Sequence, residues 1–245
     1  MSWSFVGSVT TDVFSGVSSG TVHLPSGVNG GDAVVVMCCS APTTAPQTVS
    51  LAGFTQQQSF GGGAKSGNFG DFFWGGTRAA GGSAGSATTD TTYAITFGSA
   101  TWAEALTFVL RPSGASWSVV GSGKYNGNAP GTYSTACPNA VYSPASSANA
   151  TIWAYAGQNS SVGGTGTTFS GTGPSALSNF VQASATANGG GVGAGWLQST
   201  SAPGSATASQ AVDATDFAIE LSTVAGSLPD FLRIPGQAVS RASYY

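Results

Sequence analysis

Hydrophobic and polar residues alternate in short runs along this chain, a spacing typical of β-strands that turn one face to a core. Residues 93–97 alternate strictly, and residues 20–25 alternate until Pro25 ends the segment. Residues 33–39 are instead continuously apolar, which predicts a central strand covered on both faces. No segment has a clear helical period, so the pattern predicts an all-β protein.

Further strands are expected between glycine-rich turns in both halves of the chain. In the first half they are residues 2–8, 48–58, 71–78 and 102–110. In the second half they are residues 132–136, 151–156, 180–185 and 217–221, together with a strand at Trp196.

Two local patterns recur at long range. Residues 2–8 (Ser-Trp-Ser-Phe-Val-Gly-Ser) return almost unchanged as residues 116–122, which lie 114 positions later. Trp74 and Trp196 each precede a Gly-Ser-Ala triplet by eight positions. Patterns that persist while their spacing drifts are what insertions and deletions leave after a tandem duplication.

The duplication predicts the domain organisation. We expect two tandem β-sandwich repeats, jelly-roll-like or immunoglobulin-like, at residues 1–112 and 116–226. One fused sandwich is the alternative. Residues 227–245 fall outside the repeat and form a C-terminal extended arm.

The arm has two competing interpretations. It could fold back as a strap over its own domain, or it could dock on a neighbouring subunit through apolar and aromatic anchors. A loose tail is the third option. The candidate docking residues are Phe231, Leu232, Arg233, Ile234, Tyr244 and Tyr245.

The composition of the chain argues against several classes of function. Charged residues make up 6% of the sequence, and only 6 of the 245 residues are Lys or Arg. The chain therefore has no basic stripe that could bind nucleic acid. The longest apolar run, residues 33–39, is too short to cross a membrane. Met1-Ser2-Trp3-Ser4 does not resemble a signal peptide, so we expect synthesis in the cytoplasm without classical export.

Catalytic chemistry finds little support in the sequence. His23 is the only histidine and has no evident orienting carboxylate, and the two glutamates, Glu104 and Glu220, fall in different repeats. Glu220 is expected to point to solvent. Residues 213–216 are interpreted as a turn, with a calcium site as the alternative. We therefore expect no catalytic residue, no metal and no cofactor.

The three cysteines have no metal-ligand spacing. Cys38 and Cys39 are adjacent on a strand, so they should point to opposite faces and not both be buried. We expect free thiols, with a bridge to Cys137 as the alternative.

The tryptophans separate into two groups. Trp3, Trp117, Trp74 and Trp196 occupy recurring places and are expected in the core. Aromatic residues without a partner in the repeat could form a surface platform for sugar rings. These candidate glycan-platform residues are Trp102, Tyr125, Trp153 and Tyr155.

Three segments of the first half resemble a known class of protein. They are Gly31-Asp32-Ala33-Val34-Val35-Val36, Phe73-Trp74-Gly75-Gly76-Thr77-Arg78 and Ala105-Leu106-Thr107-Phe108-Val109-Leu110-Arg111-Pro112. They resemble the Gly/Ala/Ser/Thr-rich β-sandwich proteins of tailed-bacteriophage virions. The second half departs from the pattern, because Asn149 replaces the Gly-Asp pair and Ser222 stands where Arg-Pro would follow.

The resemblance implies a non-enzymatic virion structural protein, exposed as a minor tail, tail fibre or capsid decoration component. Its implied partners are other virion proteins and copies of itself in a homo-oligomer, with a trimer as one option. The family carries no catalytic residues. The alternative function is a carbohydrate-binding module or adhesin that grips a host surface glycan for attachment.

Overall fold

The computed structural model describes most of the chain. The described residues are 2–42, 48–61, 72–114, 116–126, 133–138, 142–158, 165–185 and 189–224. The residues from Ala225 onward lie outside them, and with them the whole predicted arm at residues 227–245.

Each half of the chain builds one seven-stranded antiparallel sheet. The first sheet contains β1 (Trp3–Phe5), β2 (Thr10–His23), β3 (Ala33–Pro42), β4 (Val49–Leu51), β5 (Thr55–Gly61), β6 (Phe72–Ala79) and β7 (Thr92–Pro112). The second contains β8 (Ser116–Asn126), β9 (Ser134–Cys137), β10 (Ala150–Gln158), β11 (Phe169–Ser170), β12 (Ser178–Ala185), β13 (Gly190–Leu197) and β14 (Ala206–Val224). One short helix, α1 (Thr172–Ala176), precedes β12 among the described residues.

The two sheets have the same strand order, which supports the duplication. The first runs β1-β7-β3-β6-β5, with β2 and β4 also paired to β7. In the second, β8 pairs with β14 as β1 pairs with β7, and β10, β13 and β12 follow in the same order. β9 and β11 pair with β14 as β2 and β4 pair with β7. The predicted all-β fold is confirmed.

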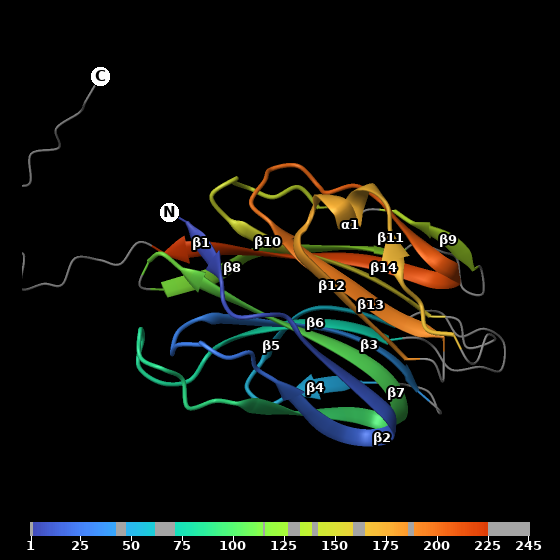
Figure 1. Cartoon of the computed structure of the whole chain (residues 1–245), viewed down its shortest axis with the longest axis horizontal. Helices are drawn as coiled ribbons and strands as arrows, with labels where there is room; N and C mark the ends of the chain where they lie inside the picture. The colour runs from blue at the N-terminus through green and yellow to red at the C-terminus, as the bar shows by residue number, and fades with distance from the viewer. Residues whose placement is uncertain are drawn as a thin grey trace, which may run out of the picture.

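The sheets lie face to face in two layers and share one inner core (Figure 1). The first sheet contributes Trp3, Ala33, Val35, Met37, Cys39, Phe73, Leu106, Phe108 and Leu110. The second contributes Ala150, Ile152, Ala154, Ala156, Ala183, Val192, Ala194, Phe217, Ile219 and Leu221. Gly75 lets the layers approach, because a Cβ there would lie 3.1 Å from a ring carbon of Phe217.

Each half also has an outer core on the other face of its sheet. The first outer core consists of Val6, Phe14, Val22, Val28, Val34, Val36, Cys38, Val49, Leu51, Trp74, Ala80, Tyr93, Ile95, Phe97, Ala103, Ala105 and Val109. The second outer core consists of Cys137, Trp153, Tyr155, Phe169, Leu177, Ala206, Ala208, Val212, Ala214 and Ala218. The halves are therefore sandwich-like units, as expected, but they are joined by a third core that belongs to both.

The inner core explains the uniformly apolar strand at residues 33–39. In β3, Val34, Val36 and Cys38 face the first outer core, and the intervening residues face the inner core. The expectation that Cys38 and Cys39 could not both be buried is wrong, because both faces of this strand are covered. Cys38, Cys39 and Cys137 form no disulfide, as predicted, and all three are fully buried.

Three strand boundaries differ from the sequence prediction. Residues 93–97 and 102–110 belong to one strand, β7, whose early part pairs with β4 and whose later part pairs with β3. The expected strand at 48–58 is divided into β4 and β5 by a turn at Gly53, which has a positive φ of 76°. Residues 10–19, for which the sequence predicted no strand, form the first part of β2.

Register also decides which tryptophans are equivalent. Trp3 pairs with Pro112 and Trp117 with Thr223, so these two tryptophans occupy matching places at the edge of the inner core. Trp74 faces the first outer core, whereas Trp196 packs against the inner core. Although both tryptophans have the same spacing from a Gly-Ser-Ala triplet, they are not structurally equivalent.

The shared core predicts that the two halves unfold together. Phe108→Ala should lower the free energy of unfolding by about 3–5 kcal/mol and should speed amide exchange in β10 as well as in β3. Hydrogen-exchange mass spectrometry measures both strands in one experiment. Val13→Ala is the control, since Val13 is 56% exposed. Faster exchange confined to residues 3–112 would show that the halves are independent.

Candidate functional site

Two of the four predicted glycan-platform residues are buried. Trp153 and Tyr155 are 2% and 1% exposed and lie in the second outer core. The Tyr155 hydroxyl donates a hydrogen bond of 2.7 Å to the carbonyl oxygen of Gly204. The prediction was wrong for these two residues because both faces of β10 are covered.

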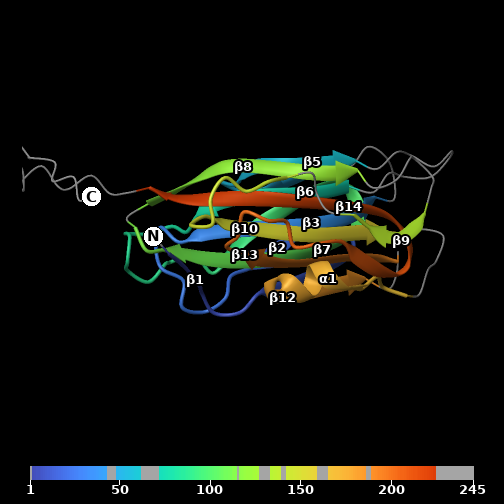
Figure 2. The same cartoon turned by 90° about the horizontal axis from the view of Figure 1, so that it is seen from above.

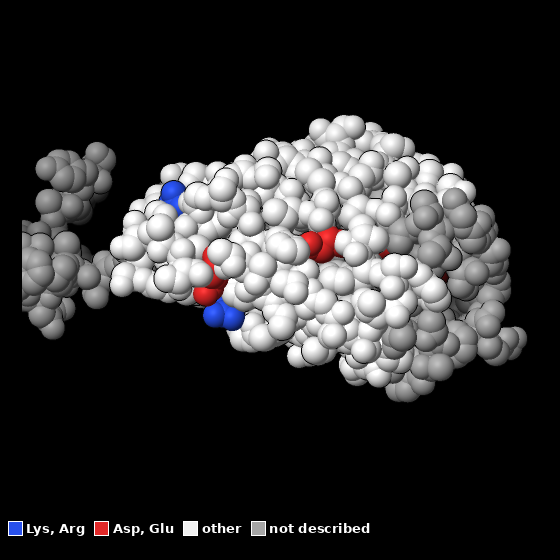
Figure 3. All heavy atoms as spheres, turned by 60° about the horizontal axis from the view of Figure 1, so that its bottom comes forward, with Lys and Arg blue, Asp and Glu red and all other residues white. Residues whose placement is uncertain are grey.

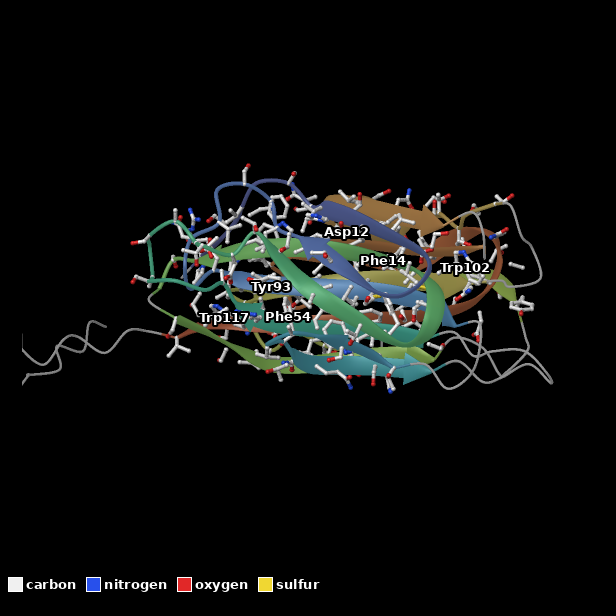
Figure 4. All side chains as sticks on the ribbon, turned by 90° about the horizontal axis from the view of Figure 1, so that it is seen from below. Asp12, Phe14, Phe54, Tyr93, Trp102 and Trp117 are labelled. Carbon is white, nitrogen blue, oxygen red and sulfur yellow. The ribbon has the colours of Figure 1, made fainter. Side chains whose placement is uncertain are left out.

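Of the other two platform candidates, Trp102 is partly exposed on β7, at the opposite end of the molecule from Trp117 (Figure 4). The side chain of Tyr125 lies outside the described residues. The six candidate arm residues, Phe231 to Ile234 with Tyr244 and Tyr245, also lie outside them.

His23 has a carboxylate partner that the sequence did not suggest. Its Nδ1 lies 2.6 Å from Asp12 Oδ1, and its backbone N–H donates to Asp12 Oδ2 at 2.9 Å. Both residues belong to β2, and they meet because this strand bends back at the register shifts between Ser15 and Ser19. The pair ties the start of β2 to its end.

Glu220 does not point to solvent, contrary to the expectation. It is fully buried on β14 and accepts hydrogen bonds from the Tyr142 hydroxyl, the Asn149 amide at 2.6 Å and the Ala145 backbone N–H at 3.0 Å. Burial raises the pKa of Glu220, but these hydrogen bonds outweigh it and hold the pKa below its usual value. Glu220 therefore anchors a loop to its strand.

An ion pair performs the same task in the first half. Asp32 is 3% exposed and accepts two hydrogen bonds from Arg111, from Nε at 2.9 Å and from an Nη at 2.8 Å. The Asn29 backbone N–H donates to the same carboxylate at 2.8 Å. The Gly-Asp and Arg-Pro segments that carry the family resemblance thus meet in a bidentate ion pair.

Residues 213–216 are not a turn but part of β14, and both aspartates are buried. Burial raises the pKa of Asp213 to about 6 and raises the pKa of Asp216 well above its usual value. Asp216 lies on the same face of its strand as Tyr155, its register partner. These two carboxyls are desolvated, in contrast to the hydrogen-bonded Glu220.

Charged atoms occur in small, separate groups on the face of the molecule seen in Figure 3, and most of that face is uncharged. No group of three or more His, Cys, Asp or Glu side chains among the described residues is placed to hold a metal ion. In the same part of the chain, no helix is long and apolar enough to cross a membrane.

A cleft of about 490 Å³ opens where the first sheet meets the second. Its walls combine one indole with hydroxyl, amide and guanidinium groups. The side chains that line it include Thr55, Gln57, Thr77, Arg78, Trp117 and Val119. Sequence analysis missed this cleft, since it placed Trp117 in the core and assigned no role to Gln57 or Thr77.

The cleft side chains are held in place by hydrogen bonds, two of which are made to other residues of the cleft wall. Trp117 Nε1 donates to the carbonyl oxygen of Gly31 at 2.9 Å. Gln57 Nε2 donates to Thr77 Oγ1 at 3.0 Å. Arg78 donates to the carbonyl oxygen of Ala52 at 3.0 Å.

The Arg78 guanidinium is also held from its other side. It lies 4.6 Å from the centre of the Tyr93 ring and 3.7 Å from an Asp90 carboxylate oxygen. Figure 4 shows Trp117, Phe54 and Tyr93 near one another.

Comparisons with protein families, with curated proteins and with solved structures found no match to this chain.

The buried aspartates predict an unusual dependence of stability on pH. Because the folded pKa of Asp213 is raised, its contribution to stability is complete below the unfolded pKa, near 4, and is lost as the pH rises towards 6. Asp213→Asn should therefore stabilise the protein at pH 7 by roughly 1–3 kcal/mol and leave it unchanged at pH 3. Urea unfolding at pH 3, 5 and 7 measures this.

Asp90→Asn is the matched control with the opposite sign. A backbone hydrogen bond from Gly81 lowers the pKa of Asp90, and Tyr93 and Arg78 add to the effect. Its contribution is present above the unfolded pKa and is lost as the pH falls through the lowered folded pKa, so this variant should lose more stability at pH 7 than at pH 3. A gain for Asp213→Asn that is equal at every pH would contradict the ionisation argument.

Proposed function

We propose that this chain is a non-enzymatic structural component of a tailed-bacteriophage particle, exposed as a minor tail, fibre or capsid decoration protein. The proposal rests first on the resemblance of three segments of the first half to such virion proteins. The observation that supports it best is the Asp32–Arg111 ion pair, which joins two of these segments and gives them a structural role.

The architecture suits a building block. Two seven-stranded sheets fused through one core form a body with little freedom between its halves. With 6% charged residues, the surface has little long-range repulsion towards neighbours, and its contacts would depend weakly on salt. A part that holds a fixed position in an assembly benefits from both properties.

The alternative of a carbohydrate-binding module loses its original basis. Two of the four residues proposed as a platform, Trp153 and Tyr155, are buried side chains of the second outer core. Glycan attachment therefore needs a different surface from the one that the sequence suggested.

The virion proposal predicts that the chain is a stoichiometric part of a particle. Particles purified from the producing culture on a density gradient should contain the intact chain after denaturing electrophoresis and mass spectrometry. Its amount should follow that of the major capsid protein across the gradient. Recovery of the chain only in the soluble lysate, with complete particles free of it, would overturn the proposal.

The proposed homo-oligomer depends on residues 227–245. Light scattering should give a multiple of the chain mass of 24.1 kDa for the full chain and a monomer for a chain that ends at Gly226. Substitution of Phe231, Leu232 and Ile234 by serine in the full chain should have the same effect, since it removes the apolar anchors. Monomers in every case would contradict docking between copies.

A further inference from the structure

The two edges of the inner core differ, although the two sheets are equivalent. At one edge, here called the open edge, β5 of the first sheet lies beside β8 and β14 of the second. At the other, the closed edge, β12 and β13 of the second sheet lie against β7 and β2 of the first. Figure 2 shows β5 and β8 on one side of the molecule and β12 on the opposite side.

Strand register identifies the equivalent positions. Thr77 pairs with Val35 in the first half, and Trp196 pairs with Ile152 in the second. Val35 and Ile152 are themselves equivalent, because each lies two residues after the alanine that pairs with the last leucine of the closing strand. Thr77 and Trp196 therefore occupy the same place on the inner face of their sheets.

A second pair of equivalent positions also has a polar residue in the first half and an apolar one in the second. Gln58 pairs with Gly75, and Val181 pairs with Ala194. Gly75 and Ala194 are the inner-facing residues two places before Thr77 and Trp196. The second half thus carries tryptophan and valine, both packed against the inner core, where the first half carries threonine and glutamine.

This exchange accounts for the cleft. At the closed edge, the Trp196 indole occupies space between the sheets and donates to Asn179 Oδ1 at 3.0 Å. At the open edge, Thr77 is too small to fill the equivalent space, and a volume of about 490 Å³ remains. Gln58 Nε2 donates to Ser122 Oγ at 2.7 Å and so joins β5 to β8 beside the cleft.

The side chains that line the cleft indicate which class of ligand it could bind. The one cation that lines the cleft, Arg78, is 3.7 Å from the Asp90 carboxylate, so its charge is largely compensated. Thr55, Gln57 and Thr77 offer hydroxyl and amide groups, and Trp117 offers an apolar ring. An aromatic ring beside uncharged hydrogen-bonding groups is suited to a molecule with hydroxyls at its rim and C–H groups on its face.

We propose that the open-edge cleft binds a neutral saccharide, with one sugar ring against Trp117 and its hydroxyls hydrogen-bonded by Gln57 and Thr55. The hydrogen bonds that fix Trp117, Gln57 and Arg78 hold these side chains in position before the ligand arrives, which lowers the entropic cost of binding. This site is independent of the proposed place in a particle.

The test begins with the full chain on an array of neutral and acidic oligosaccharides, followed by titration of the best neutral binder. Thr77→Trp is the decisive variant, because it places at the open edge the residue that the closed edge already accommodates. It should fold like the natural chain and weaken binding by at least about tenfold. Gln57→Ala, at a partly exposed residue, should weaken binding about five- to tenfold and keeps the test valid if Thr77→Trp does not fold.

Trp102→Ala is the matched aromatic control and should leave affinity unchanged, since Trp102 lies outside the cleft. Absence of binding to every neutral saccharide, or binding to acidic saccharides alone, overturns the proposal. So does a folded Thr77→Trp variant, or a Gln57→Ala variant, that binds as tightly as the natural chain. None of these outcomes bears on whether the chain is found in particles.

Discussion

The structure depends on the inner core, where the two sheets cover each other. Without it, the inner faces of β3 and β10 would expose rows of aliphatic side chains to water, at a cost of roughly 25 cal/mol for each Å² of apolar surface. With it, both central strands are covered on two sides, which is why residues 33–39 have no polar position. Burial also raises the pKa of Asp213 and of Asp216 on β14, and Asp216 lies on the face of the second outer core, opposite Tyr155.

The two halves attach equivalent loops with different interactions, an ion pair in the first half and a hydrogen-bonded carboxylate in the second. The loop before each central strand must be attached to the closing strand of its half. Asp32 and Arg111 do this through a bidentate ion pair, and Asn149 does it through Glu220, which also accepts from Tyr142. Asn149 stands at the position equivalent to Asp32, but its partner Glu220 comes one residue before Leu221, whereas Arg111 comes one residue after the equivalent Leu110. The loss of Arg-Pro in the second half is therefore compensated.

Sequence patterns predicted what depends on local periodicity and missed what depends on distant segments. Alternation and the apolar run identified the class of fold and the central strand. Alternation could not show that α1, β9 and β11 cover the outer face of β10, so Trp153 and Tyr155 were mistaken for surface residues. The equivalence of Thr77 and Trp196 follows from pairing with β3 and β10 and is invisible in the linear spacing, which points to Trp74 instead.

In a duplicated fold whose halves share one core, residues of the inner core and residues at its edges differ in how freely they can be substituted. Inner-core positions are constrained twice, because each side chain packs against its own sheet and against the other, and volume errors there are costly. Edge positions meet one neighbour and solvent, so they tolerate a change of size and polarity. Thr77 and Trp196 are at this boundary: the tryptophan completes the packing at one edge, and the threonine leaves space at the other. A cleft between the halves is thus a direct consequence of a duplicated fold whose core is shared and whose edges are not.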